Sequence, residues 1–133
     1  MNQHTISRIA INVLAIVLII FGIYHFMQPQ NMVAWVPTWV PGGIIWVYIV
    51  GAAFIATGLS FITNKLVKYS GYALAILLFM FVITIHLPNY LNGGDPELRQ
   101  ISFISLLKDT ALAAFALYIA SNADYRKSLT QLD

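Results

Sequence analysis

The stretch IAINVLAIVLIIFGIYHFM, residues 9–27, decides the class of this protein because it is mainly apolar and holds no Asp, Glu, Lys or Arg. As an α-helix it covers about 28 Å, close to the thickness of the hydrocarbon core of a bilayer. The lack of charge continues to residue 64, which leaves room for two membrane spans joined by a turn. The stretch exceeds the apolar region of a cleaved signal peptide, and no small-residue cleavage site follows it, so we expect a retained anchor.

The composition of the whole chain agrees with a membrane protein. Of its 133 residues, 59% are hydrophobic and 9% are charged, whereas a soluble domain carries about 25% charged residues. The chain has no cysteine, which excludes disulfides, thiolate nucleophiles and cysteine metal sites. A net charge of +2, dispersed along the sequence, does not indicate a partner that is a nucleic acid.

Apolar segments separated by proline and glycine predict four membrane-spanning helices within one domain, residues 1–133. The middle connection, TNKLVK, is so short that the second and third helices should be antiparallel neighbours. The predicted fold class is therefore all-α, an integral membrane four-helix bundle with a proline-rich outer loop between helices 1 and 2. The expected spans are about 7–27, 43–62, 67–86 and 100–120.

The basic residues predict that both termini face the cytoplasm (N-in, C-in), because loops kept in the cytoplasm carry an excess of lysine and arginine. The side of the membrane shared by both termini has five basic residues, and the opposite side has only Arg99. The five are Arg8, Lys65, Lys68, Arg126 and Lys127.

The outer loop, residues 28–43, is rich in tryptophan as well as proline. It holds Trp35 and Trp39, and Trp46 lies just beyond it. Tryptophan favours the water–lipid interface, so we expect this segment to lie along the outer surface of the membrane. A lid over a ligand site is the alternative.

Lys108 and Asp109 are charged residues inside the fourth predicted span, about 12 Å from its outer end by helical rise. On insertion scales, each costs about 2.5–3.5 kcal/mol at the centre of a membrane helix. Adjacent helical residues are about 100° apart, so their adjacency alone does not make them a pair. Lys108 can extend toward the outer headgroups. Asp109 shares a face with small and polar residues and should point into the bundle.

Further polar side chains map to the outer half of the membrane, the half that holds Asp109. A lone histidine at a helix end is more often interfacial or hydrogen-bonded than a ligand, but several such groups from different helices favour a pocket open to one side. The inner half has no matching charged group, which argues against a channel. A metal site is not predicted, because no spacing such as HExxH is present. The predicted pocket residues are Tyr24, His25, Trp46, Tyr48, His86, Lys108 and Asp109.

Several segments together resemble the DoxX-like family of small four-helix bacterial membrane proteins. They are GIYHFMQP (22–29), the proline-rich loop after it, WVYIVGAAFIATGL (46–59) and the KD pair followed by small residues. The resemblance covers about residues 9–121 and implies a bundle in the bacterial cytoplasmic membrane. Some members of that family are associated with quinone-linked sulfur oxidation or with oxidative-stress assemblies, and many have no established activity. The resemblance extends residue by residue to His25 and the Lys108–Asp109 pair. Redox-associated branches of the family use cysteine pairs, which this chain lacks.

Three hypotheses on function follow. In the first, the chain is an accessory subunit of a membrane redox system that binds a quinone or a lipid-like amphiphile. It is then not a complete enzyme on its own, because no haem, flavin or iron–sulfur motif is visible. The second is a small dimeric transporter, and the third is a non-catalytic assembly or chaperone-like membrane protein. The partners expected are the lipid bilayer, redox subunits and further copies of the chain.

Overall fold

The computed structural model of the protein describes residues 1–132. Within these residues the chain is helical and contains no strand. Four of its helices are long and apolar enough to cross a membrane, which marks a multi-pass membrane protein. The elements are α1 (Gln3–Met27), α2 (Pro29–Val33), α3 (Ile44–Thr63), α4 (Val67–Phe81), the π-helical turn η1 (Val82–His86), α5 (Leu87–Asn92), α6 (Pro96–Ser121) and α7 (Ala123–Thr130).

The fourth span begins four residues before its predicted start near Gln100, because the residues around Pro96 form a good helix start. The side chain of Asp95 accepts a hydrogen bond from the backbone N–H of Glu97. Pro96 occupies the first helical position, where its missing N–H leaves no helical hydrogen bond unmade. As a consequence, Asp109 lies at the middle of α6 and further from its start than the sequence predicts.

The third span is predicted to end near His86. In the structure it continues past Pro88 to Asn92. Proline normally disrupts a helix because it lacks an N–H and its ring clashes with the carbonyl four residues earlier. Here the chain widens into the π-helical turn η1 just before Pro88, and the N–H of Leu87 bonds to the carbonyl of Val82. The widened turn accommodates the proline, and it carries His86. Such turns are frequent at functional sites.

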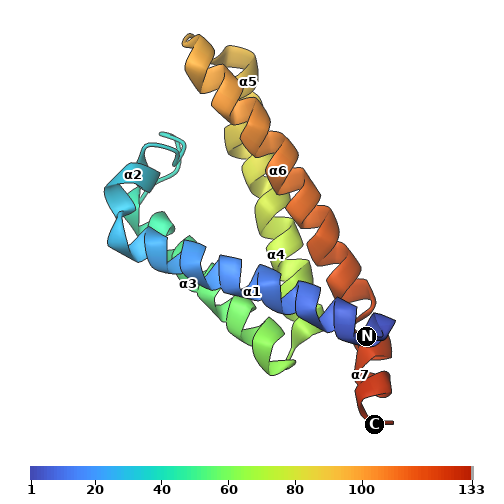
Figure 1. Cartoon of the computed structure of the whole chain (residues 1–133). Helices are drawn as coiled ribbons and strands as arrows, with labels where there is room; N and C mark the ends of the chain where they lie inside the picture. Colours follow the sequence, from blue (N-terminus) through green and yellow to red (C-terminus); the bar gives the residue numbers. More distant parts are fainter. Residues whose placement is uncertain (133) are drawn as a thin grey trace.

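The four long helices form two pairs. α1 packs along α3, and α4 with its continuation packs along α6, and these are the most extensive helix contacts. Figure 1 shows the two pairs meeting near the end that holds both termini and diverging toward α2 and α5. The short connection around Asn64 and Leu66, both with a φ of 57°, joins α3 to α4. These two helices are in contact, as the short connection predicts. Their contact is less extensive than the contact within either pair.

Small residues let α1 and α3 approach closely. A Cβ atom added to Gly58 would lie 2.7 Å from the carbonyl oxygen of Ala15 in α1. About two helical turns away along α3, the two helices are equally close, because a Cβ atom on Gly22 would lie 2.6 Å from the carbonyl oxygen of Gly51. Close backbone approach at small residues is a common means of helix association in membranes. This close packing holds α1 and α3 together as one pair.

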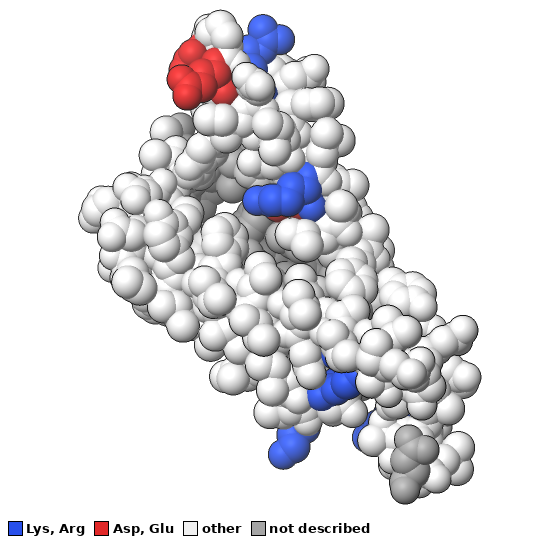
Figure 2. Space-filling model, in the orientation of Figure 1, with Lys and Arg blue, Asp and Glu red and all other residues white. Residues whose placement is uncertain are grey.

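The packed core lies where the two pairs meet. Phe61, Leu74 and Ile119 come from three different helices, and each is at most 2% exposed. Arg8 fastens α1 to the end of α3 by donating hydrogen bonds to the carbonyls of Phe61 (3.1 Å) and Ile62 (2.7 Å). Basic side chains gather at this end of the molecule (Figure 2), which we call the basic end. It is defined by Arg8, Lys65, Lys68, Arg126 and Lys127.

Candidate functional site

A cavity of about 710 Å³ lies between the two helix pairs, within the range of about 300–1,000 Å³ that is usual for small-molecule sites. Its walls come from α1, α3, α4, η1, α6 and the segment 28–43. Figure 2 shows a hollow in the middle of one side of the molecule, with basic atoms at its edge and acidic atoms behind them. The walls are mainly apolar and include six aromatic residues other than histidine: Phe21, Trp35, Trp39, Trp46, Phe54 and Phe81.

Asp109 is the centre of a polar cluster on the α6 side of the cavity. It is 6% exposed, which confirms the prediction that it points inward. One carboxylate oxygen, Oδ2, lies 2.9 Å from Nε2 of His86, and the other, Oδ1, lies 3.4 Å from the ammonium nitrogen of Lys108. With the carboxylate as acceptor, His86 donates through Nε2, whereas Lys108 forms an ion pair with Asp109. Ser102 and Ala113 on the same face of α6 are also buried, as the small-residue stripe predicts.

The ammonium of Lys108 lies close to two groups of the cavity wall. Its side chain is 54% exposed, yet its ammonium turns back toward the neighbouring Asp109. The same ammonium lies 5.9 Å from the centre of the Phe21 ring in α1, within range of a cation–π contact. The four-carbon stem of lysine is long and flexible enough to overcome the angle of about 100° between adjacent residues. Lys108 therefore connects the polar cluster to the opposite helix pair.

His25 lies on the other wall of the cavity, in the last turn of α1. Its ring is buried, with Nδ1 2.8 Å from the backbone carbonyl of Phe21. When Nδ1 carries the proton and donates this bond, Nε2 of the neutral ring is a hydrogen-bond acceptor. The rings of Phe21 and Phe54 hold the imidazole in place at centroid distances of 4.9 and 5.5 Å. His25 is thus both a hydrogen-bonded helix-end residue and a wall of the cavity.

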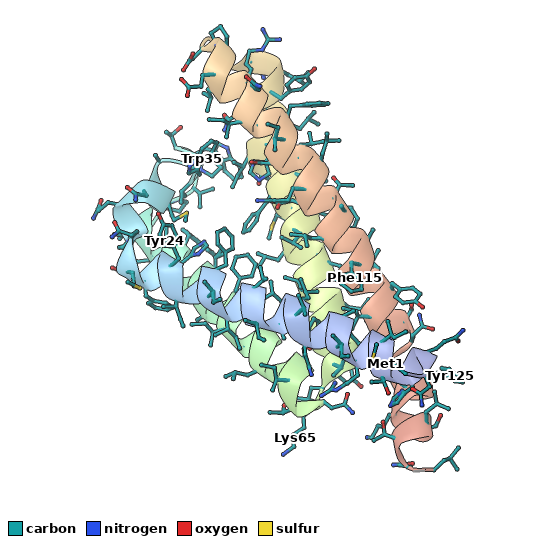
Figure 3. All side chains as sticks on the ribbon, in the orientation of Figure 1. Met1, Tyr24, Trp35, Lys65, Phe115 and Tyr125 are labelled. Carbon is teal, nitrogen blue, oxygen red and sulfur yellow. The ribbon has the colours of Figure 1, made fainter. Side chains whose placement is uncertain are left out.

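The segment 28–43 reaches from the α1–α3 pair to the other helix pair. The ring of Trp35, labelled in Figure 3, lies 6.4 Å from the ring of His86. The indole N–H of Trp46 donates a 2.7 Å hydrogen bond to the carbonyl of Pro41, which ties the end of the segment to α3. Six of the cavity-lining residues come from this segment: Met32, Trp35, Val36, Pro37, Trp39 and Val40.

Two residues of the predicted pocket do not reach the cavity. Tyr24 is 40% exposed and directed away from it, because a residue adjacent to His25 is rotated by about 100° on the helix. Tyr48 stacks on Phe26 at a centroid distance of 5.5 Å and is likewise not a lining residue. The other five predicted residues, His25, Trp46, His86, Lys108 and Asp109, do line the cavity.

Several lining residues were missed in the sequence, although helical spacing offers a signal for them. Phe21 lies four residues before His25, and Ser105 lies four residues before Asp109, so each shares a face with a predicted residue. Thr84 comes from the π-helical turn, which no pattern in the sequence indicates. Residues 1–132 contain no group of three His, Asp or Glu side chains arranged to hold a metal ion.

The fold and the cavity define a multi-pass membrane protein with a mainly apolar cavity between its helix pairs and a polar cluster on one wall of that cavity. The chain belongs to the family described as Domain of unknown function (DUF8561), whose model matches residues 14–120. That match includes both His25 and the Lys108–Asp109 pair. No curated protein and no solved structure matches the chain.

Proposed function

We propose that the protein is a DoxX-like integral membrane protein that binds a quinone or a similar small amphiphile in the cavity between its helix pairs. In this proposal it is an accessory subunit of a redox system in the bacterial cytoplasmic membrane. The observation that carries the proposal is the cavity itself, about 710 Å³ with aromatic walls and the Asp109–His86–Lys108 cluster on one side. An amphiphile with a polar ring and an apolar tail matches that division of polar and apolar surface.

The polar groups suit the two redox states of a quinone. The ammonium of Lys108 has three N–H donors and forms an ion pair with Asp109, so it can also donate to a quinone carbonyl. Nε2 of His25, on the opposite wall, is an acceptor suited to the hydroxyl of a quinol. Asp109 and His86 form a hydrogen-bonded pair that can take up a proton released by the bound ring. The electron carrier belongs to a partner subunit, since this chain has no motif for one.

The shape of the cavity supports access from the bilayer. The hollow opens on the side of the helices, the surface that lipid surrounds when the helices span a membrane (Figure 2). Toward the basic end the lining stops at Leu14, Leu77 and Leu112. Beyond them the packed core of Phe61, Leu74 and Ile119 follows, which supports a one-sided site rather than a channel.

Tryptophan fluorescence tests the binding. All three tryptophans of the chain line the cavity, so quenching by a quinone reports on its occupancy. The full chain in phosphatidylcholine nanodiscs is titrated with decylubiquinone, and we expect saturable quenching. Tyr48→Phe, outside the cavity, should leave the curve unchanged. Quenching that rises without saturation, as for tryptophan octyl ester in the same nanodiscs, would contradict the proposal.

The Lys108 contact gives a second expected result. Lys108→Leu should weaken decylubiquinone binding about tenfold, because a hydrogen bond to a charged group contributes about 1.5–3 kcal/mol. Lys108→Arg keeps a long cation at the same place and should stay within about twofold of the unchanged protein. The same fluorescence titration measures both variants. Equal binding by the leucine and arginine variants would show that Lys108 does not contact the ligand.

The proposal places both termini in the cytoplasm and the α5–α6 turn outside, with the four spans as one bundle. The five basic residues of the basic end support this orientation. Because the chain has no cysteine, single cysteines at Gln131 and Asn92 can be labelled selectively in intact bacterial cells. We expect an impermeant thiol reagent to label Asn92→Cys and to label Gln131→Cys only after the cells are opened. The opposite labelling pattern would reverse the orientation.

A further inference from the structure

A second, smaller crevice lies at the basic end, about 250 Å³ in volume. It runs between the first turns of α1 and the last turns of α6, and α7 supplies one end of it. Ile6 and Ala10 from α1 face Phe115 from α6 and make the crevice apolar along its length. Arg126 from α7 supplies a positive charge, accompanied by the polar side chains of Gln3 and Ser7.

In the part of the chain that the structure describes, no carboxylate balances the positive charge beside the crevice. Within residues 1–132, neither Arg8 nor Arg126 has an acidic side chain within 4.0 Å. Asp124 pairs with Lys68 at 2.9 Å instead. Arg126 donates a hydrogen bond from Nη2 to the carbonyl of Ile119, which leaves its Nε and Nη1 groups for another acceptor.

The two arginines also influence each other. Burial is the main cause that lowers the pKa of the Arg126 guanidinium below its ordinary value, and the positive charge of Arg8 acts in the same direction. An anion held against Arg126 would offset this repulsion and would provide the missing acceptor. The crevice thus combines an unbalanced cationic end with an apolar trough, at the end of helices long enough to span a bilayer.

We propose that this crevice binds an anionic phospholipid of the adjacent leaflet, with its phosphate against Arg126 and an acyl chain along Ile6, Ala10 and Phe115. Basic pockets between membrane helices are suited to such headgroups, at about 1 kcal/mol for each basic residue near the surface. Free phosphate offers the same charge but has no acyl chain to use the apolar trough. The site is separate from the large cavity, so it does not depend on the function proposed above.

The test is native mass spectrometry of the full chain released from nanodiscs that contain phosphatidylcholine and phosphatidylglycerol. We expect the protein to retain phosphatidylglycerol about fivefold more than its share of the nanodisc lipid, the ratio that one basic contact supplies. Arg126→Gln should abolish the preference. Lys127→Gln removes the same charge from the next residue, which does not line the crevice, and should retain the preference.

A second variant keeps the test decisive if Arg126→Gln does not fold. Ala10→Trp fills the exposed trough without changing any charge, and it should also abolish the preference. A large excess of inorganic phosphate should not displace the lipid. The proposal is overturned if phosphate displaces the lipid, if Ala10→Trp leaves retention unchanged, or if Arg126→Gln and Lys127→Gln reduce it equally.

Discussion

Asp109→Leu is expected to weaken decylubiquinone binding at least about 30-fold, the largest effect we predict on the cavity. The substitution removes the acceptor that holds His86 at 2.9 Å and Lys108 at 3.4 Å. Truncating one partner of a buried, hydrogen-bonded charge pair typically costs about 2–5 kcal/mol, because the other partner is left without compensation. The dissociation constant from tryptophan quenching measures the effect.

Two variants make this result interpretable. Glu97→Leu removes a carboxylate from the first turn of the same helix, outside the cavity, and should bind decylubiquinone normally. Asp109→Asn keeps the shape and one acceptor oxygen of the side chain but loses its charge, and it should fall between the two. If Asp109→Leu binds as tightly as the unchanged protein, the polar cluster has no part in ligand binding and serves to fix helix packing.

Gly58→Val is expected to destabilise the fold by about 3 kcal/mol, the upper part of the range for overpacking. Even a Cβ atom at Gly58 would lie 2.7 Å from the carbonyl oxygen of Ala15, and that backbone atom cannot move without separating α1 from α3. Unfolding by SDS titration in mixed micelles measures the change. Gly94→Val is the matched control, because a Cβ atom there would have nothing within 4 Å. Equal loss of stability in both variants would contradict the close packing of α1 on α3.

The sequence predicts the helices of this protein well because apolar length is a property of each segment alone. It predicts their ends less well where the local chemistry competes with a simple rule. Pro96 begins α6 as its first residue, so the helix starts earlier than a count of apolar residues indicates. Pro88 is carried inside a helix because η1 widens the turn before it, and no periodicity in the sequence indicates that turn.

The candidate site is only partly predictable. The sequence indicates how far along its helix a residue lies better than it indicates which way the side chain points. The inward direction of Asp109 is predictable, because its small neighbours define an inward face of α6. Tyr24 and Tyr48 are predicted in the same half of the membrane as Asp109, but they lie on faces that do not reach the cavity. The contact between Lys108 and Phe21 depends on how the two helix pairs diverge. That divergence is set by packing between distant segments and is not visible in any one of them.

Photo-crosslinking with an azido-quinone tests most directly whether the cavity between the helix pairs is a quinone-binding site. The full chain in nanodiscs is illuminated with the probe, and the labelled peptides are identified by mass spectrometry. We predict labels on both walls, in residues 32–54 and 105–112, that excess decylubiquinone suppresses. Labels spread over exposed, outward-facing residues such as Ile76 and Ile83, and unaffected by decylubiquinone, would contradict it.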